Sequence, residues 1–132
     1  MAADRPDVFA SSGSTVQAEI EAAMRDSGEG ERWESIFLFS SEGLLMARHG
    51  FSPAYDEENL LEFAFSLIGV VRLIENDLPV KEIVVKGKEK KRLVFRYFEA
   101  WGEQVVLAAV VSGRKGFRRA IGKLMRFIRG LG

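Results

Sequence analysis

Two serines, a glutamate and a histidine lie close together in the chain, and residues of these types could form a hydrolytic site. Ser40, Ser41 and Glu42 occur in the stretch IFLFSSEGLLMARHG, and His49 follows near its end. A serine nucleophile needs a base within hydrogen-bond reach and a third group that orients the base. Two apolar runs flank SSEG, which predicts a β-hairpin with Gly43 in its turn. A hairpin of this length separates its turn from its open end by roughly 15–20 Å. We therefore expect these residues to have a structural role.

Metal and nucleotide chemistry have little basis in the sequence. The chain has no cysteine, and the acidic run DEE that starts at Asp56 lacks the spacing and the glycine of a calcium-binding loop. These acids are better placed to favour the N-terminus of a helix. The stretch GFRRAIGK from Gly116 has five residues between its glycines, where a phosphate-binding loop has four, and no Ser or Thr follows. We expect no catalytic residues, no metal and no cofactor.

Length and composition predict one globular domain. The chain has 132 residues, of which 47% are hydrophobic, and this is enough for an adequate core. Residues 1–13 show no periodicity and predict a flexible N-terminal arm, whereas residues 14–132 form the domain. The first residues lack the features of a signal peptide, and no apolar run approaches the roughly 20 residues of a membrane-spanning helix. We expect a cytoplasmic protein.

The formal net charge is zero, but acidic and basic residues occupy different halves of the chain. Residues 1–62 contain 13 Asp and Glu against 4 Lys and Arg, and residues 63–132 contain 6 against 15. No acid follows Glu103, and the C-terminal segment carries seven basic residues: Arg114, Lys115, Arg118, Arg119, Lys123, Arg126 and Arg129. A second basic cluster comprises Lys86, Lys88, Lys90, Lys91 and Arg92.

Two interpretations of the two basic clusters remain open. Either cluster could contact an anionic partner, which would be a nucleic acid or a membrane surface. Alternatively, the basic residues form a solvated face that pairs with acids of the first half, in particular Glu19, Glu21, Glu29, Glu31 and Glu34. No aromatic residue interleaves with the basic residues on the expected exposed face, and this argues against stacking on single-stranded nucleic acid.

The hydrophobic pattern predicts three helices and five strands in the order α-β-β-α-β-β-β-α. The first helix begins at Ser14 or Thr15, where a side chain can cap it, and repeats apolar residues every four positions. The expected strands are residues 33–39, 44–48, 80–86, 92–100 and 104–111, and the other helices are residues 56–75 and the C-terminal segment from 114.

The central helix, residues 56–75, is apolar on nearly every side. Some of its apolar residues must belong to the core, because one side lies on the sheet. A chain of this length has little left to cover the other side, and a second subunit would cover it. We expect a dimer interface here, with an ordinary core as the alternative.

This order of elements resembles the roadblock/dynein light-chain family over roughly residues 14–131. The resemblance rests on IFLFSSEGLLMARHG, on the helix EENLLEFAFSLIGVVRLIE and on the strand pair EIVVKGKEKKRLVFRYF. It implies an α/β, more strictly α+β, fold of the profilin-like roadblock type: a five-stranded antiparallel sheet with helices on both faces. Two features depart from the family pattern, namely the bulky Phe63 and Phe65 in the central helix and the strongly basic C-terminal helix.

The resemblance also implies a non-catalytic function. Roadblock proteins usually dimerise by packing their central helices together and pairing their third strands, and many act as platforms or regulators for Ras-like small GTPases. We therefore expect a homodimer, or a heterodimer with another roadblock chain, that binds such a GTPase and modulates its GTP turnover. The alternative is an anionic partner on the basic helix. The interface residues expected from the resemblance and the helix pattern are Leu60, Phe63, Leu67, Val70, Val71, Ile74, Ile83 and Val85.

Overall fold

The computed structural model describes residues 13–27, 33–74, 80–113 and 116–131. The elements within these ranges are α2 (Gly13–Ser27), β1 (Ser35–Phe39), β2 (Leu45–Gly50), α3 (Glu57–Ile74), β3 (Glu82–Lys86), the short 3-10 helix η1 (Lys88–Lys90), β4 (Arg92–Ala100), β5 (Glu103–Val111) and α4 (Arg118–Gly130).

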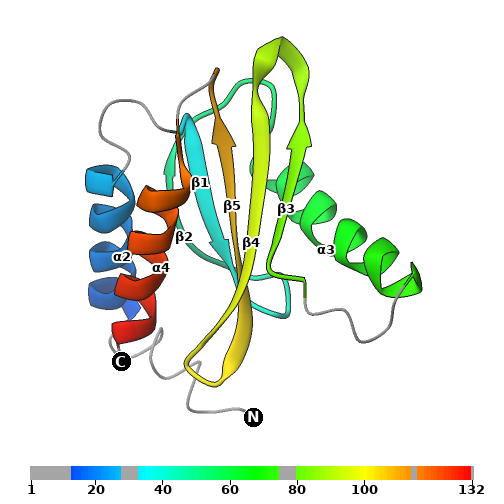
Figure 1. The fold of residues 1–132 in the computed structure, drawn as a ribbon. Helices are drawn as coiled ribbons and strands as arrows, with labels where there is room; N and C mark the ends of the chain where they lie inside the picture. The colour runs from blue at the N-terminus through cyan, green and yellow to red at the C-terminus, as the bar shows by residue number, and fades with distance from the viewer. Residues whose placement is uncertain (1–12, 28–32, 75–79, 114–115, 132) are drawn as a thin grey trace.

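The five strands form one antiparallel sheet with the order β2-β1-β5-β4-β3. Every residue of β1 is buried, which explains why its apolar residues do not alternate with polar ones. In Figure 1, α2 and α4 lie side by side on one face of the sheet, and α3 covers the opposite face. The predicted element order and the α+β fold are confirmed.

Helices α2 and α4 cover the first face through the apolar residues that recur at helical spacing. Ile20 and Met24 of α2, with Ile121 and Ile128 of α4, are completely buried. They share one core with Ile36 of β1 and with the same side of β5 and β4. No helix among the described residues is both long enough and apolar enough to cross a membrane.

Helix α3 covers the second face, and its first half is fixed there. Leu60 and Ala64 are fully buried against Phe39 and Phe95. The hydroxyl of Tyr97 on β4 donates a 2.6 Å hydrogen bond to the Ala64 carbonyl oxygen. The C-terminal half of α3 extends past β3 in the view of Figure 1. The sheet therefore buries one side of the helix and leaves the other side exposed.

The β1–β2 hairpin has the predicted turn. Gly43 has φ +84°, and its amide donates a 3.0 Å hydrogen bond to the Ser40 carbonyl oxygen. The Ser40 hydroxyl oxygen accepts hydrogen bonds from the amides of Glu42 and Leu44, at 3.2 and 3.1 Å. A register shift between Leu38 and Phe39 marks a bulge that the sequence pattern did not predict. Ser40 thus stabilises the turn through both its hydroxyl and its backbone.

Several element boundaries differ from the sequence prediction. Strand β3 begins at Glu82 rather than residue 80, and α2 begins at Gly13, within the expected arm. The rest of that arm lies outside the described residues. Helix η1 was not predicted because Glu89 and Lys90 adopt positive φ angles of 56° and 64°, a conformation that neither residue type favours.

Candidate functional site

The hydroxyls and the histidine of the hairpin do not meet. His49 pairs with Ile36 at the open end of the β1–β2 ladder, whereas Ser40 lies in the turn. The Ser41 hydroxyl donates a 2.9 Å hydrogen bond to Oε1 of Glu103 on β5. The expected separation is confirmed, and both serines have local structural partners. A serine–histidine site would need a base that reaches the hydroxyl, and this hairpin holds them apart.

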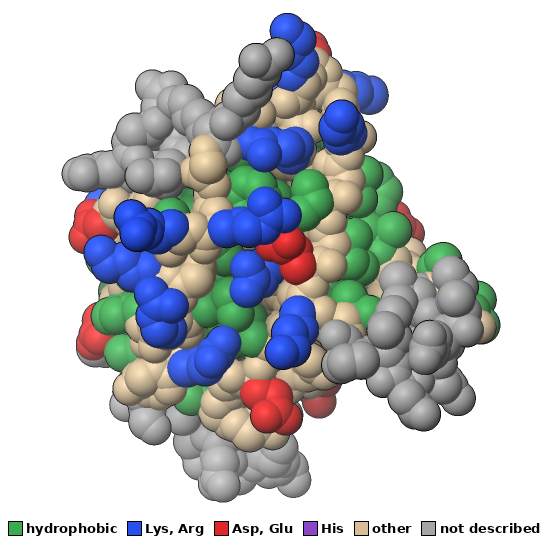
Figure 2. Space-filling view, viewed as in Figure 1, with side chains coloured by type: hydrophobic (Ala, Val, Ile, Leu, Met, Phe, Trp, Pro, Cys, Tyr) green, Lys and Arg blue, Asp and Glu red, His purple; other side chains and the backbone are tan. Residues whose placement is uncertain are grey.

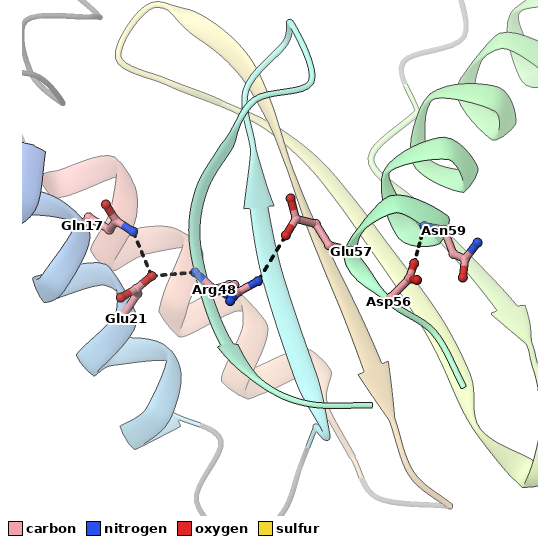
Figure 3. A network of polar contacts seen from close by, with 6 residues as sticks. All are labelled: Gln17, Glu21, Arg48, Asp56, Glu57 and Asn59. Carbon is pink, nitrogen blue, oxygen red and sulfur yellow. Dashed lines mark hydrogen bonds and ion pairs between the residues drawn. The ribbon is translucent and has the colours of Figure 1, made fainter. Parts of the chain in front are cut away.

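The acids that precede α3 act on the helix and on its neighbours. Oδ1 of Asp56 accepts a 2.9 Å hydrogen bond from the Asn59 amide, which makes Asp56 the predicted N-cap. Glu57 Oε1 lies 3.2 Å from Nη1 of Arg48 on β2. Figure 3 shows both contacts. Within the described ranges, no group of three or more metal-ligating side chains could hold a metal ion.

The outer side of α3 is an exposed apolar surface. Phe63, Val70 and Leu73 expose 41%, 55% and 86% of their surface. Seven residues make nearly two helical turns, so Phe63 and Val70 lie about 20° apart around the axis, whereas Phe65 lies about 160° from Phe63. Phe65 is also exposed and faces the hairpin turn, where it lines a groove with Ser41. Helix α3 therefore presents two separate apolar flanks.

The expected interface residues fall into four groups, of which the fourth is Leu60 alone. Phe63 and Val70 are exposed, and Leu67 is half-buried on the same flank of α3. Ile83 and Val85 are half-buried on the α3 side of β3. The side chains of Val71 and Ile74 lie outside the described part of the chain.

Leu60 has no exposed surface and belongs to the core of the single chain. Its inclusion among the interface residues was wrong in this respect, because helix periodicity could not show which side of an all-apolar helix meets the sheet. Leu73 was missed, although its position three residues after Val70 could have indicated it.

The two edges of the sheet differ in their protection. At the β2 edge, the Arg48 amide donates a 3.0 Å hydrogen bond to Oε2 of Glu21 on α2, and Gln17 donates to the same oxygen. Figure 3 shows how Arg48 links α2 on one side to Glu57 of α3 on the other. Strand β3 pairs with β4 on one side, and no described strand pairs with its other side. The β3 edge is therefore the one open to a further strand.

The basic residues of α4 lie on its exposed side. Figure 2 shows Lys and Arg side chains gathered over α4 and the strands beside it. Arg118 lies 3.0 Å from Oε1 of Glu82 on β3, and the Arg129 guanidinium lies 5.6 Å from the Phe98 ring centre. Arg119, Lys123 and Arg126 are exposed. Arg114 and Lys115 lie outside the described residues.

Among the described residues, no acid of the first half forms an ion pair with α4. Glu19 is exposed, and Glu21 bonds to Gln17 and to the backbone of Arg48. Glu34 pairs with Lys91, so the predicted pairing with an acid of the first half is confirmed for one residue of the second basic cluster. Glu29 and Glu31 lie outside the described residues. The described ion pairs of α4 go to Glu82, an acid of the second half of the chain.

Three arginines surround one ring and one carboxylate beside α4. The guanidinium carbons of Arg92 and Arg118 lie 5.1 and 4.8 Å from the centre of the Phe117 ring, which is buried. Arg96 pairs with the same Glu82 as Arg118, at 3.3 Å. Glu82 is therefore shared by two guanidinium groups on this part of the surface. Arg96 was not among the predicted basic residues because its strand pattern gave no sign of which face it occupies.

The order of the elements and their layers define a small roadblock-type α+β domain, and solved structures show the same fold. Myxococcus xanthus MglB superposes with a TM-score of 0.62 at 17% identity, over 88% of this chain and 86% of that chain. A roadblock/LC7 domain from Streptomyces avermitilis gives 0.64 at 19% identity, over 83% and 93%.

A structure of MglB with a tetrameric arrangement gives a TM-score of 0.61 at 15% identity, over 86% of this chain and 90% of that chain. No protein-family model and no curated protein sequence matches this chain. The likeness establishes that the chain has the roadblock/LC7 fold.

Proposed function

We propose that this protein is a non-catalytic, dimeric binding module that regulates a Ras-like small GTPase. One observation supports the dimer. The exposed apolar flank of α3, which includes Phe63 and Val70, and the open edge of β3 are both available for contact with another chain. Apolar surface of this kind is a usual site of protein association. A second copy would cover both features at once, in line with the tetrameric arrangement named for one MglB structure.

The arrangement of the two subunits in such a dimer is determined by the way in which their β3 strands pair. If β3 pairs antiparallel with β3 of a second copy around a two-fold axis, the two sheets become one sheet of ten strands. The axis is then perpendicular to the sheet, so both α3 helices lie on one face and both α4 helices on the other. Phe63 and Val70 face the axis, whereas Phe65 remains exposed beside the hairpin turn.

The groove beside Phe65 is the docking surface that we propose for the GTPase. It has a volume of about 230 Å³ and is lined by Ser41, Phe65, Tyr97 and Gln104, among others. It combines apolar walls with a few polar groups, as protein-binding surfaces commonly do. The assignment of a GTPase as the partner rests on the family resemblance, which the shared fold supports.

Light scattering during size-exclusion chromatography tests the dimer. We expect a mass about twice the 14.8 kDa of one chain. Val70→Asp places a charge on the apolar flank and should give a folded monomer, because burying an unpaired carboxylate is costly. Phe51→Asp changes a still more exposed apolar residue outside α3 and should leave the dimer intact. A monomeric wild-type protein at high concentration would refute the dimer.

Binding and turnover measurements test the GTPase. A Ras-like GTPase from the same genome, loaded with a GTP analogue, should form a complex with the wild-type protein, and its GTP hydrolysis rate should change. Phe65→Ala should weaken the complex at least tenfold while the dimer mass stays the same, because an interface aromatic that contributes strongly costs about 2 kcal/mol or more when truncated. Absence of both a complex and a rate change would contradict the proposal.

A further inference from the structure

Three cations of α4 form a stripe that the rest of the protein leaves exposed. Arg119, Lys123 and Arg126 follow one another at spacings of four and three residues, which places them on one side of the helix. All three are exposed, and none makes an ion pair with a described residue. Helix α4 contains no acid, so no residue of the helix itself offsets the charge of the stripe.

An exposed aromatic ring accompanies the stripe. Phe127 exposes 41% of its surface, although α4 has its other large apolar residues in the core. With Arg119 and Lys123 it lines a shallow hollow of about 530 Å³ between α4 and the end of α2. Asp26 also lines the hollow and pairs with Arg25 of its own helix. The surface of α4 thus presents cations and one apolar side chain around the same hollow.

The stripe lies on a broad basic face, beside which Asp26 is also exposed. Arg92, Arg96 and Arg118 extend the positive charge across β4, and Glu82 pairs with Arg96 and Arg118. On the other side of the molecule, the hairpin turn and the first turns of α3 carry five acids: Glu42, Asp56, Glu57, Glu58 and Glu62. In an electric field from an anionic surface, the molecule would turn α4 towards that surface.

We propose that the basic face of α4 binds an anionic phospholipid membrane surface. Clusters of four to eight Lys and Arg on a helix are sufficient for such attraction, and each contributes measurably when it reaches the headgroups. The Phe127 ring can enter the boundary between headgroups and acyl chains while the cations contact lipid phosphates. Arginine suits this contact because its guanidinium binds two phosphate oxygens at once.

The shape of the face favours a membrane over double-stranded nucleic acid. A helix that reads DNA must enter a groove about 8.5 Å deep, but α4 buries one side in the core and packs beside α2. Helix α4 therefore does not project from the domain as a groove-reading helix would. The proposed dimer would place two basic faces on the same side of one sheet. The presence of two faces rests on the proposed function, whereas each stripe is formed by a single chain.

Vesicle flotation tests the proposal on the full chain. We expect binding to vesicles of phosphatidylcholine mixed with phosphatidylglycerol, none to phosphatidylcholine alone, and loss of binding as salt rises from 50 to 500 mM, which are chosen test conditions. The triple variant Arg119→Gln, Lys123→Gln, Arg126→Gln should lower the affinity about 100-fold. The matched control Lys86→Gln, Lys88→Gln, Lys90→Gln removes the same charge from the β3–β4 hairpin and should lower it much less.

Three outcomes would overturn the proposal. The first is no binding to the anionic vesicles at low salt, and the second is an equal loss in the two triple variants. The third is binding to a DNA duplex without binding to vesicles, which would assign the face to nucleic acid. Val70→Asp separates this proposal from the dimer: a monomeric variant should still float with anionic vesicles, at lower affinity because it has one face instead of two.

Discussion

Single residues at one end of the sheet show how closely the backbone segments approach there. Gly50 ends β2 with φ +87°, and a Cβ at this position would overlap the carbonyl oxygen of Glu34. The Phe51 amide donates a 2.9 Å hydrogen bond to that same oxygen. The Glu34 carbonyl and the backbone of Gly50 cannot move apart without disturbing the pairing of β1 with β2. The glycine is therefore required both for its conformation and for space.

Replacing this glycine should destabilise the fold strongly. Gly50→Ala combines the strain of a left-handed residue with a backbone overlap, and we expect a loss of about 3 kcal/mol or more in the free energy of unfolding. Gly102→Ala is the matched control, because Gly102 has φ +77° but nothing within 4 Å of a new Cβ. It should cost about 1–2 kcal/mol. Urea titrations of both variants provide the comparison, and equal losses would contradict the overlap.

Glu34 connects three strands through its carboxylate. It pairs with Lys91 before β4 and accepts a 2.8 Å hydrogen bond from the Ser112 hydroxyl after β5. Burial alone would raise the pKa of Glu34, but the hydrogen bonds from Lys91 and Ser112 and the charge of Lys91 outweigh it, so the pKa lies below its usual value of 4.5. The ionised form is thus favoured in the folded state.

This shift predicts acid sensitivity. A carboxylate with a lowered pKa stabilises the fold above its unfolded pKa, and the contribution is lost as pH falls through the folded pKa. Glu34→Gln should therefore be less stable than wild type at pH 7, and the difference should shrink below about pH 4.5. Urea unfolding at several pH values measures it, with Glu19→Gln as the control for loss of an exposed carboxylate. A difference that does not depend on pH would contradict this role.

Sequence reasoning reached the local roles of residues and missed the distant ones. The turn glycine Gly43 and the cap Asp56 were predictable because their partners lie within a few residues. Glu34 was among the acids expected to pair with basic residues, but the sequence did not identify its partners Lys91 and Ser112, which are 57 and 78 residues away. Only the strand order brings these groups together.

At the scale of elements, α3 shows what a pattern can and cannot determine. Its length and its start were predictable from an apolar stretch that follows a capping acid. The side of α3 that faces the sheet was not predictable, because apolar residues lie on nearly every side of the helix. The sheet selects Leu60 and Ala64 for burial, with the Tyr97 hydroxyl as a fixed point on the helix backbone. The sides left over become the two exposed flanks.

The N-terminal cap of α3 should contribute measurably to stability. Asp56→Ala removes the acceptor for the Asn59 amide, and we expect a loss of about 1 kcal/mol. Asp56→Asn keeps an acceptor oxygen and should recover most of this loss. Thermal and urea unfolding of the two variants test the cap. If both variants lost the same stability, the charge rather than the hydrogen bond would be responsible.

At the scale of the whole molecule, folding turns a charge difference along the chain into a charge difference between faces. The unequal halves were visible in the sequence, but the sequence suggested that they might neutralise each other. In the structure, the cations of α4 and β4 gather on one face, which Figure 2 shows. Helix α3, with the acids of its first turn, packs against the opposite face of the sheet. The carboxylate shared by Arg96 and Arg118 is Glu82.

Removing that shared carboxylate should have opposite effects on binding and stability. Glu82→Gln raises the positive charge of the basic face, and we expect its affinity for anionic vesicles to rise several-fold. Because the ion pairs are partly exposed, the free energy of unfolding should fall by less than about 1 kcal/mol. Glu58→Gln makes the same change in net charge on the opposite face and should leave vesicle affinity nearly unchanged. Equal gains in both variants would point to net charge alone.

The position of β5 has a consequence for how the protein is made. The β1–β2 and β3–β4 hairpins share no strand pairing, and β5 joins them by pairing with β1 on one side and β4 on the other. A ribosome therefore releases both hairpins before it releases the strand that unites them. Until residue 111 emerges, the edges of β1 and β4 that pair with β5 are unpaired, and the nascent chain is exposed to aggregation at that stage. Chaperone capture should peak on nascent chains that stop before β5.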